Sequence, residues 1–213
     1  MSRSLYALST MPGSPLRARN NEPIPIDARA ADHLRYIRET MERASEFTAV
    51  PGWGAVATGL TAIAAAYIAS RQHTGQGWLA VWLVEAFVAV AVTGSAAATK
   101  AHRLDSKLFS GPGKKFLLSF LPSVLVGALL TLVLANLAMF SILPGIWLLL
   151  YGTAVVTGGA FSVRSIPVMG LCLMALGAAA LFSPQRMGDV YMAMGFGAVQ
   201  IGFGLWIAQR HGG

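Results

Sequence analysis

The chain has 213 residues, of which 55% are hydrophobic and 12% are charged, and its formal net charge is +7. A soluble globular domain carries about 25% charged residues, so this composition excludes a protein with an ordinary water-facing surface. The apolar residues also form runs of about 20, the length at which an α-helix crosses a hydrocarbon core of ~30 Å. The sequence therefore predicts an all-α, polytopic membrane protein.

Two segments precede the apolar runs. Residues 1–26 are rich in proline and polar side chains and contain no apolar signal region, so we predict a disordered cytoplasmic tail. Residues 27–50 place apolar side chains at steps of three and four, which is typical of an amphipathic helix. We expect this cytoplasmic helix to lie on the membrane, to pack on cytoplasmic loops or to pair with another copy.

Residues 51–213 contain six apolar runs, which we predict to form one transmembrane domain. Runs of this length are helical in a bilayer because no water is present there to satisfy backbone groups. The predicted spans are 53–70, 78–98, 116–139, 142–162, 166–183 and 188–208.

The basic residues are distributed unevenly around these spans. If the six spans alternate in direction, 14 of the 16 lysines and arginines fall on the side of the two termini, and Arg71 and Arg186 fall on the other. Cytoplasmic loops carry the excess of basic residues, so both termini are expected in the cytoplasm. We interpret the net charge as a topology signal and expect the lipid bilayer, not nucleic acid, as the partner of these residues.

Small side chains recur at every fourth position along the first span. They are Gly54, Thr58, Ala62, Ala66 and Ser70. Shorter patterns of small residues in the last span include Gly197 and Gly202. Such patterns are typical of faces at which membrane helices approach closely, either within one bundle or between protomers.

Glu85 lies inside the apolar stretch AVWLVEAFVAVAV, residues 80–92. An ionised carboxylate there is costly, so it should face the bundle interior or a wet cavity, be neutral, or have a partner. Asn136 and Tyr67 come to a similar depth in alternating spans and are the expected hydrogen-bond partners, while Gln200 adds polarity in the last span. Glu85 is interpreted either as a proton or cation relay or as a structural, hydrogen-bonded group.

No familiar catalytic or metal-binding motif is present in the sequence. The four histidines lie outside the predicted spans, and Cys172 is the only cysteine. The GPGKK stretch at 111–115 lacks the Ser or Thr of a phosphate-binding loop. We therefore expect no enzyme activity, no cofactor and no metal site.

Two segments, LPGIWLLLYGTAVVTGGAFSVRSIPVMG and GFGAVQIGFGLWIAQRHGG, resemble a group of uncharacterised bacterial integral membrane proteins with six spans. The resemblance extends over all six spans and the IRETMERASEF segment, but not over residues 1–26. It implies a bacterial inner (plasma) membrane, and because that group has no assigned activity it implies no site residues.

Two functional hypotheses remain. The first is a non-enzymatic protein that acts by association, as a scaffold, regulator or accessory subunit, in a homo-oligomer or with a membrane-protein partner. The second is a small secondary transporter or channel that uses the carboxylate of Glu85.

Overall fold

The computed structural model describes residue 34 and residues 52–103, 111–160 and 165–211. The chain divides into two units, Met1–Arg43 and Ala44–Gly213, and all the helices described below belong to the second. The predicted tail at 1–26 lies outside the described residues. So does the predicted amphipathic helix at 27–50, except for Leu34, which is helical and exposed.

The described part of the second unit is helical and contains no strand. The α-helices are α2 (Gly52–Ala69), α3 (Gly75–Arg103), α4 (Gly111–Asn136), α5 (Leu143–Gly159), α6 (Ser165–Phe182), α7 (Gly188–Met192) and α8 (Gln200–His211). Short 3-10 turns at Phe140–Ile142 and Gln185–Met187 precede α5 and α7, and the π-helix Ala193–Val199 joins α7 to α8.

Six helical segments in the described residues are long and apolar enough to cross a membrane. Each of their limits lies within three residues of the corresponding predicted span. The last of them, Gln185–Arg210, includes α7, the π-helix and most of α8. The predicted fold class, an all-α polytopic membrane protein with six spans, is confirmed.

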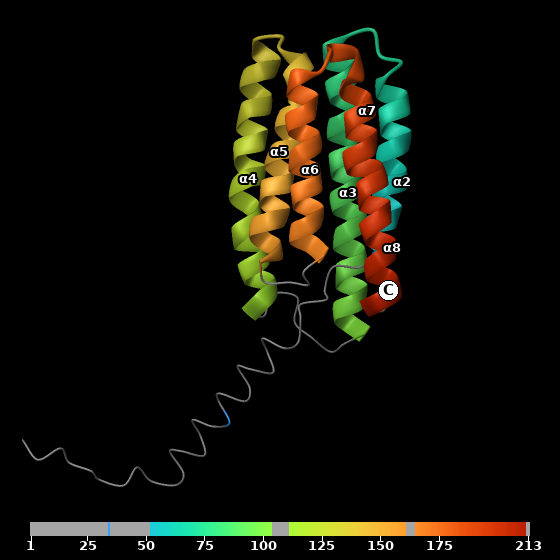
Figure 1. Ribbon diagram of the computed structural model, residues 1–213, viewed down its shortest axis with the longest axis vertical. Helices are drawn as coiled ribbons and strands as arrows, with labels where there is room; N and C mark the ends of the chain where they lie inside the picture. The colour runs from blue at the N-terminus through green and yellow to red at the C-terminus, as the bar shows by residue number, and fades with distance from the viewer. Residues whose placement is uncertain (1–33, 35–51, 104–110, 161–164, 212–213) are drawn as a thin grey trace, which may run out of the picture. The chain divides into compact units, whose positions relative to one another are not determined.

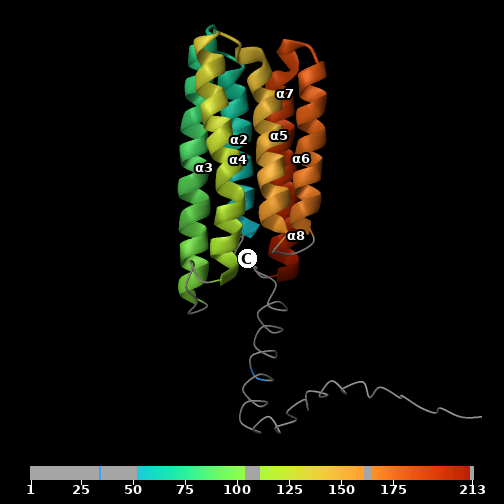
Figure 2. The same ribbon diagram turned by 90° about the vertical axis from the view of Figure 1, so that its left-hand side faces the viewer.

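The spans run side by side with alternating direction, and the turns after α2, α4 and α6 lie at the same end (Figures 1 and 2). α2 packs against α3 and against the π-helix and α8. α5 packs against α4 and α6, and it also contacts α7. α2 and α5 are thus the two helices around which the others are arranged.

Two helix pairs approach closely because glycines remove side chains from their contact. A Cβ atom added at Gly152 of α5 would lie 2.7 Å from the carbonyl oxygen of Gly170 on α6, and the reverse distance is also 2.7 Å. A Cβ atom at Gly59 of α2 would lie 2.9 Å from the carbonyl oxygen of Gly197. These contacts bring backbone against backbone, the kind of packing that small residues permit between membrane helices.

Most of the small-residue stripe predicted on the first span is buried by this packing. The buried members are Gly54, Thr58, Ala62 and Ala66. Ser70 lies beyond the end of α2 and is exposed. In the last span, Gly197 is buried against Ile63, whereas Gly202 is exposed and a Cβ atom there would meet nothing within 4 Å among the described residues. Gly202 therefore takes no part in the packing of this bundle.

We predict that Gly152→Ala destabilises the protein. The added methyl group would have to displace the backbone of α6, and overpacking of this kind costs about 1–3 kcal/mol. The midpoint of thermal unfolding in detergent should fall.

The matched control is Gly202→Ala, which adds the same methyl group to an open helical position. Alanine is favoured over glycine inside a helix by about 0.5–1 kcal/mol, so this variant should unfold at the same temperature or higher. Equal unfolding temperatures for Gly152→Ala and the unchanged protein would contradict the close α5–α6 contact.

Candidate intramembrane carboxylate site

Glu85 projects from α3 toward α2 and is 9% exposed. It lies ten residues from the start of α3 at Gly75, which places it about 15 Å along the helix axis. The helix around it is made of Ala, Val, Leu, Trp and Phe, residues that a hydrocarbon environment accepts. The carboxylate is therefore held within the span, well away from the interface.

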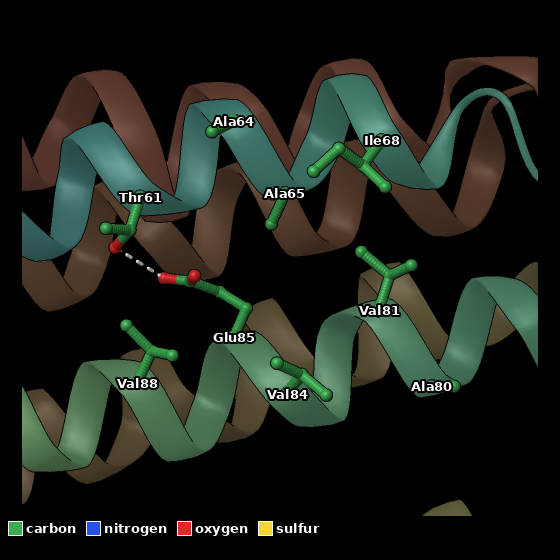
Figure 3. Close-up of a pocket in the computed structure, with 9 residues that line it drawn as sticks. All are labelled: Thr61, Ala64, Ala65, Ile68, Ala80, Val81, Val84, Glu85 and Val88. Atoms are coloured by element: carbon green, nitrogen blue, oxygen red, sulfur yellow. Dashed lines mark hydrogen bonds between the residues drawn. The ribbon is translucent and has the colours of Figure 1, made fainter.

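Thr61 of α2 is the hydrogen-bond partner of Glu85. Its hydroxyl lies 2.8 Å from Oε1 of Glu85 and 3.0 Å from the carbonyl oxygen of Thr58 (Figure 3 shows the first bond). A hydroxyl has one hydrogen to donate and can also accept, so it cannot donate to both oxygens at once. When Glu85 is protonated, its acid group donates to Thr61 and Thr61 donates to Thr58. When Glu85 is ionised, the Thr61 hydroxyl turns and donates to it.

An open groove of about 500 Å³ runs between α2 and α3 at this point (Figure 3). The lining residues are Thr61, Ala64, Ala65, Ile68, Ala80, Val81, Val84, Glu85 and Val88. Several of them, such as Ile68 and Val84, are half or more exposed, so the groove opens on the outer surface of the bundle. A carboxylate thus forms part of the wall of an otherwise apolar groove on a membrane-spanning surface.

Further polar side chains lie on the other side of α2. The amide nitrogen of Gln200 lies 3.3 Å from the hydroxyl of Tyr151 on α5, and the hydroxyl of Thr58 is 3.4 Å from the Gln200 amide oxygen. Gln200 and Thr58 are both buried. The Thr58 hydroxyl is closer, at 3.0 Å, to two carbonyl oxygens of its own helix, and Thr61 contacts the Thr58 carbonyl rather than that hydroxyl. Polar groups of α5, α8 and α2 therefore lie in a row that leads to the groove, without forming one continuous hydrogen-bond chain.

The π-helix Ala193–Val199 ends directly before Gln200. It places Phe196 against Tyr151, with ring centroids 5.1 Å apart, and against Trp82, at 6.4 Å. Isolated π-helical turns within α-helices occur frequently at functional sites. The last span is therefore irregular at the position where it contributes its amide to the polar row.

Two of the candidate residues lie elsewhere. Tyr67 is 63% exposed, and its hydroxyl accepts a hydrogen bond of 2.8 Å from Arg71. Asn136 is exposed at the end of α4, a helix that packs against α5. The partner of Glu85 is instead Thr61, which sequence reasoning missed, although Thr61 lies eight residues from the end of α2, a depth similar to that of Glu85 in α3.

Asp189, near the start of the last span, also has a partner. The indole nitrogen of Trp78 donates a hydrogen bond of 2.7 Å to Oδ1 of Asp189, and the Trp78 ring stacks on Trp147. The indole nitrogen of Trp82, one turn further along α3, is buried and has no partner among the described residues. Asp189 is thus bonded to the first turn of α3, and neither it nor Trp78 lines the groove.

A search of the described residues finds no group of three or more His, Cys, Asp or Glu side chains that could hold a metal ion. Cys172 is exposed on α6. No protein-family model, curated protein or solved structure matches the chain.

We predict that Thr61→Val destabilises the protein by about 1–3 kcal/mol, because it leaves the acid group of Glu85 in an apolar setting without its partner. Thr61→Ser keeps the hydroxyl and should behave like the unchanged protein. The measurement is the free energy of unfolding in detergent micelles.

A double-substitution cycle isolates the bond. Replacing both partners by apolar groups is often nearly neutral, so Thr61→Val combined with Glu85→Leu should cost less than the sum of the two single changes. Strict additivity would mean that the hydrogen bond between Thr61 and Glu85 contributes nothing to stability.

Proposed function

We propose that this chain is a small secondary transporter of the bacterial inner membrane in which Glu85 binds either a proton or a substrate. One observation carries the proposal: a carboxylate that is 9% exposed forms part of the wall of a groove open to the outer surface of the bundle. Ionisable residues inside membrane spans are costly and typically mark pathways for ions, protons or substrates. A purely structural carboxylate has no need of an open groove beside it.

The bond to Thr61 supports exchange at this carboxylate. The neutral acid is satisfied when it donates to Thr61, and the anion is satisfied when Thr61 turns to donate to it. Both protonation states therefore keep a hydrogen bond without movement of either helix. A group that cycles between two charge states inside a membrane requires such a neighbour.

The polar row and the π-helix support a transporter over a purely structural bundle. Transporters bind their substrates near the bilayer midplane, at interrupted helices. Here the last span stays helical but changes its hydrogen-bond register in the π-helix Ala193–Val199, which leads into Gln200. Gln200 in turn contacts Thr58, about one turn from Thr61 on α2. The sixth span is therefore the element whose rearrangement we expect to accompany exchange at Glu85.

The proposed setting has both termini in the cytoplasm. It rests on the charge distribution, with 14 of 16 basic residues on the side of the termini, and on the resemblance noted above. In the structure, Arg71 and Arg186 follow α2 and α6, at the end opposite Lys114, Lys115 and Arg210 (Figure 1). We infer that the end carrying Lys114, Lys115 and Arg210 faces the cytoplasm.

The decisive test asks whether Glu85 exchanges protons with both sides of the membrane. A hydrophobic carbodiimide reacts with the protonated form of a carboxyl group in an apolar setting. In proteoliposomes, labelling of Glu85, measured by peptide mass spectrometry, should fall when the pH is raised on either side. A transporter requires this response because its site opens to each side in turn.

Two variants control this measurement. Glu85→Gln should remove the adduct, and Asp189→Asn, which alters a carboxylate outside the groove, should leave it unchanged. If labelling did not change with the pH on either side, we would conclude that Glu85 is a structural group. A response to one side only would also reject the transporter.

Association remains a second candidate, and one observation favours it. In the most apolar 18-residue window of α3, 6% of the residues are buried, against 44% for α2. Phe87 and Val90 of α3 are 77% and 73% exposed. Most of the small-residue stripe of α2 is buried within the bundle, so this broad apolar surface of α3 is where we would place a second copy of the chain.

We predict that, if α3 self-associates, Val90→Cys in a Cys172→Ser background forms cross-linked dimers in native membranes. The matched control is Leu171→Cys, a position on α6 that is 57% exposed. Equal cross-linking at the two positions would indicate random collision and would reject association through α3.

A further inference from the structure

The groove between α2 and α3 has the size and character of a site for a small organic molecule. Its volume of about 500 Å³ falls in the range of roughly 300–1,000 Å³ that is typical of ligand pockets. Seven of its nine lining residues are Ala, Val or Ile, and the other two are Thr61 and Glu85. Apolar walls with few polar groups are the usual composition of such pockets.

The charge of the lining defines the complementary ligand. Glu85 is the single ionisable residue among the nine, and no Lys, Arg or His lies among them. The Thr61 hydroxyl can donate to an ionised Glu85 but does not neutralise it, so a positive charge close by would stabilise the anion in these apolar surroundings. The rest of the ligand must be apolar to fill the space between Ala64, Val84 and Val88.

Two other sources of positive charge fit the groove poorly. Metal cations such as Ca²⁺ take about six to eight oxygen ligands, and the side chains that line the groove supply oxygens only from Glu85 and Thr61. A lipid headgroup amine would have to leave the interface, because Glu85 lies about 15 Å along the axis from the start of α3. A cation with its own apolar body carries no such penalty.

We propose that the groove binds a lipophilic organic monocation, an ammonium or phosphonium ion with an apolar body, that enters from the bilayer. This inference rests on the proposed function and names its substrate class. As the cation arrives, the proton of Glu85 leaves to the aqueous phase and the carboxylate pairs with the cation, so one positive charge replaces another. Thr61 then turns from the Thr58 carbonyl to the carboxylate.

The experiment measures binding of tetraphenylphosphonium to the purified full chain in lipid nanodiscs by equilibrium dialysis. One ion per chain should bind, with an affinity that rises with pH because protons compete for Glu85. Binding should release protons into a weakly buffered solution. Glu85→Gln should weaken binding at least tenfold, while triphenylphosphine oxide, a neutral analogue, should bind to both proteins equally.

A second pair of variants tests the groove without touching the carboxylate. Ala80→Phe places a ring in the groove and should also weaken binding. Ala86→Phe adds the same ring on α3 at an exposed position outside the groove and should leave binding unchanged. The unfolding temperature of each variant shows whether a loss of binding reflects loss of the fold.

The possible outcomes separate this inference from the function on which it rests. Equal binding to the unchanged protein and to Glu85→Gln would overturn it, since the ion would then be partitioning into apolar surface. If the ion did not bind but carbodiimide labelling followed the pH on both sides, the substrate class would be wrong and the proposal of a transporter would still hold. Specific binding without that two-sided response would support the site and reject transport.

Discussion

The constraint on which this structure depends is that a hydrocarbon environment supplies no hydrogen-bond partners. Several polar side chains in the spans therefore form hydrogen bonds within their own helix: Thr131 and Thr153 donate to carbonyl oxygens one turn earlier. Trp147 donates to Thr131 and Trp78 donates to Asp189, so two indoles are satisfied between helices. Glu85 differs because its partner lies across an open groove, where a further molecule has room to bind.

Glycine determines where the helices touch and, as a consequence, where they do not. The contacts between α5 and α6 and between α2 and the last span use glycines against backbone, which leaves no space for a ligand there. No glycine of α3 makes such a contact with α2, and α3 itself is little buried. The groove lies along this α2–α3 contact.

The fold was largely predictable from sequence because the thickness of the bilayer sets the length of a span and its hydrocarbon core sets the hydropathy. All six spans appear within three residues of their predicted limits. It was harder to predict which side of each helix is buried in the bundle. The four-residue stripe correctly marked the buried side of the first span, whereas a similar pattern in the last span included Gly202, which is exposed. A pattern of small residues shows where another helix could approach closely, but it does not show whether a helix packs there or which one.

The candidate site was predictable in its centre but not in its surroundings. Glu85 stands out because a carboxylate in an apolar run is costly wherever it faces. Its neighbours depend on which helices are adjacent, and α3 packs against α2 rather than against α4, which carries Asn136. The π-helix before Gln200 leaves no simple trace in residue periodicity, since its residues, AMGFGAV, suit an ordinary membrane helix equally well.

The Thr61–Glu85 pair also determines how proton and ligand must be related. Thr61 offers a hydrogen bond to either form of the acid, but the residues that line the groove offer no positive charge to the anion. In the proposed site a bound cation supplies that charge, so each ligand that binds would displace the proton, and each proton that returns would weaken the ligand by the same factor. Competition of this kind requires no long-range conformational signal, because both ligands meet at one carboxylate. What a transporter must add is a change in which side of the membrane supplies the proton. We propose the sixth span for that change, because its π-helix leads into Gln200, which contacts Thr58 about one turn from Thr61.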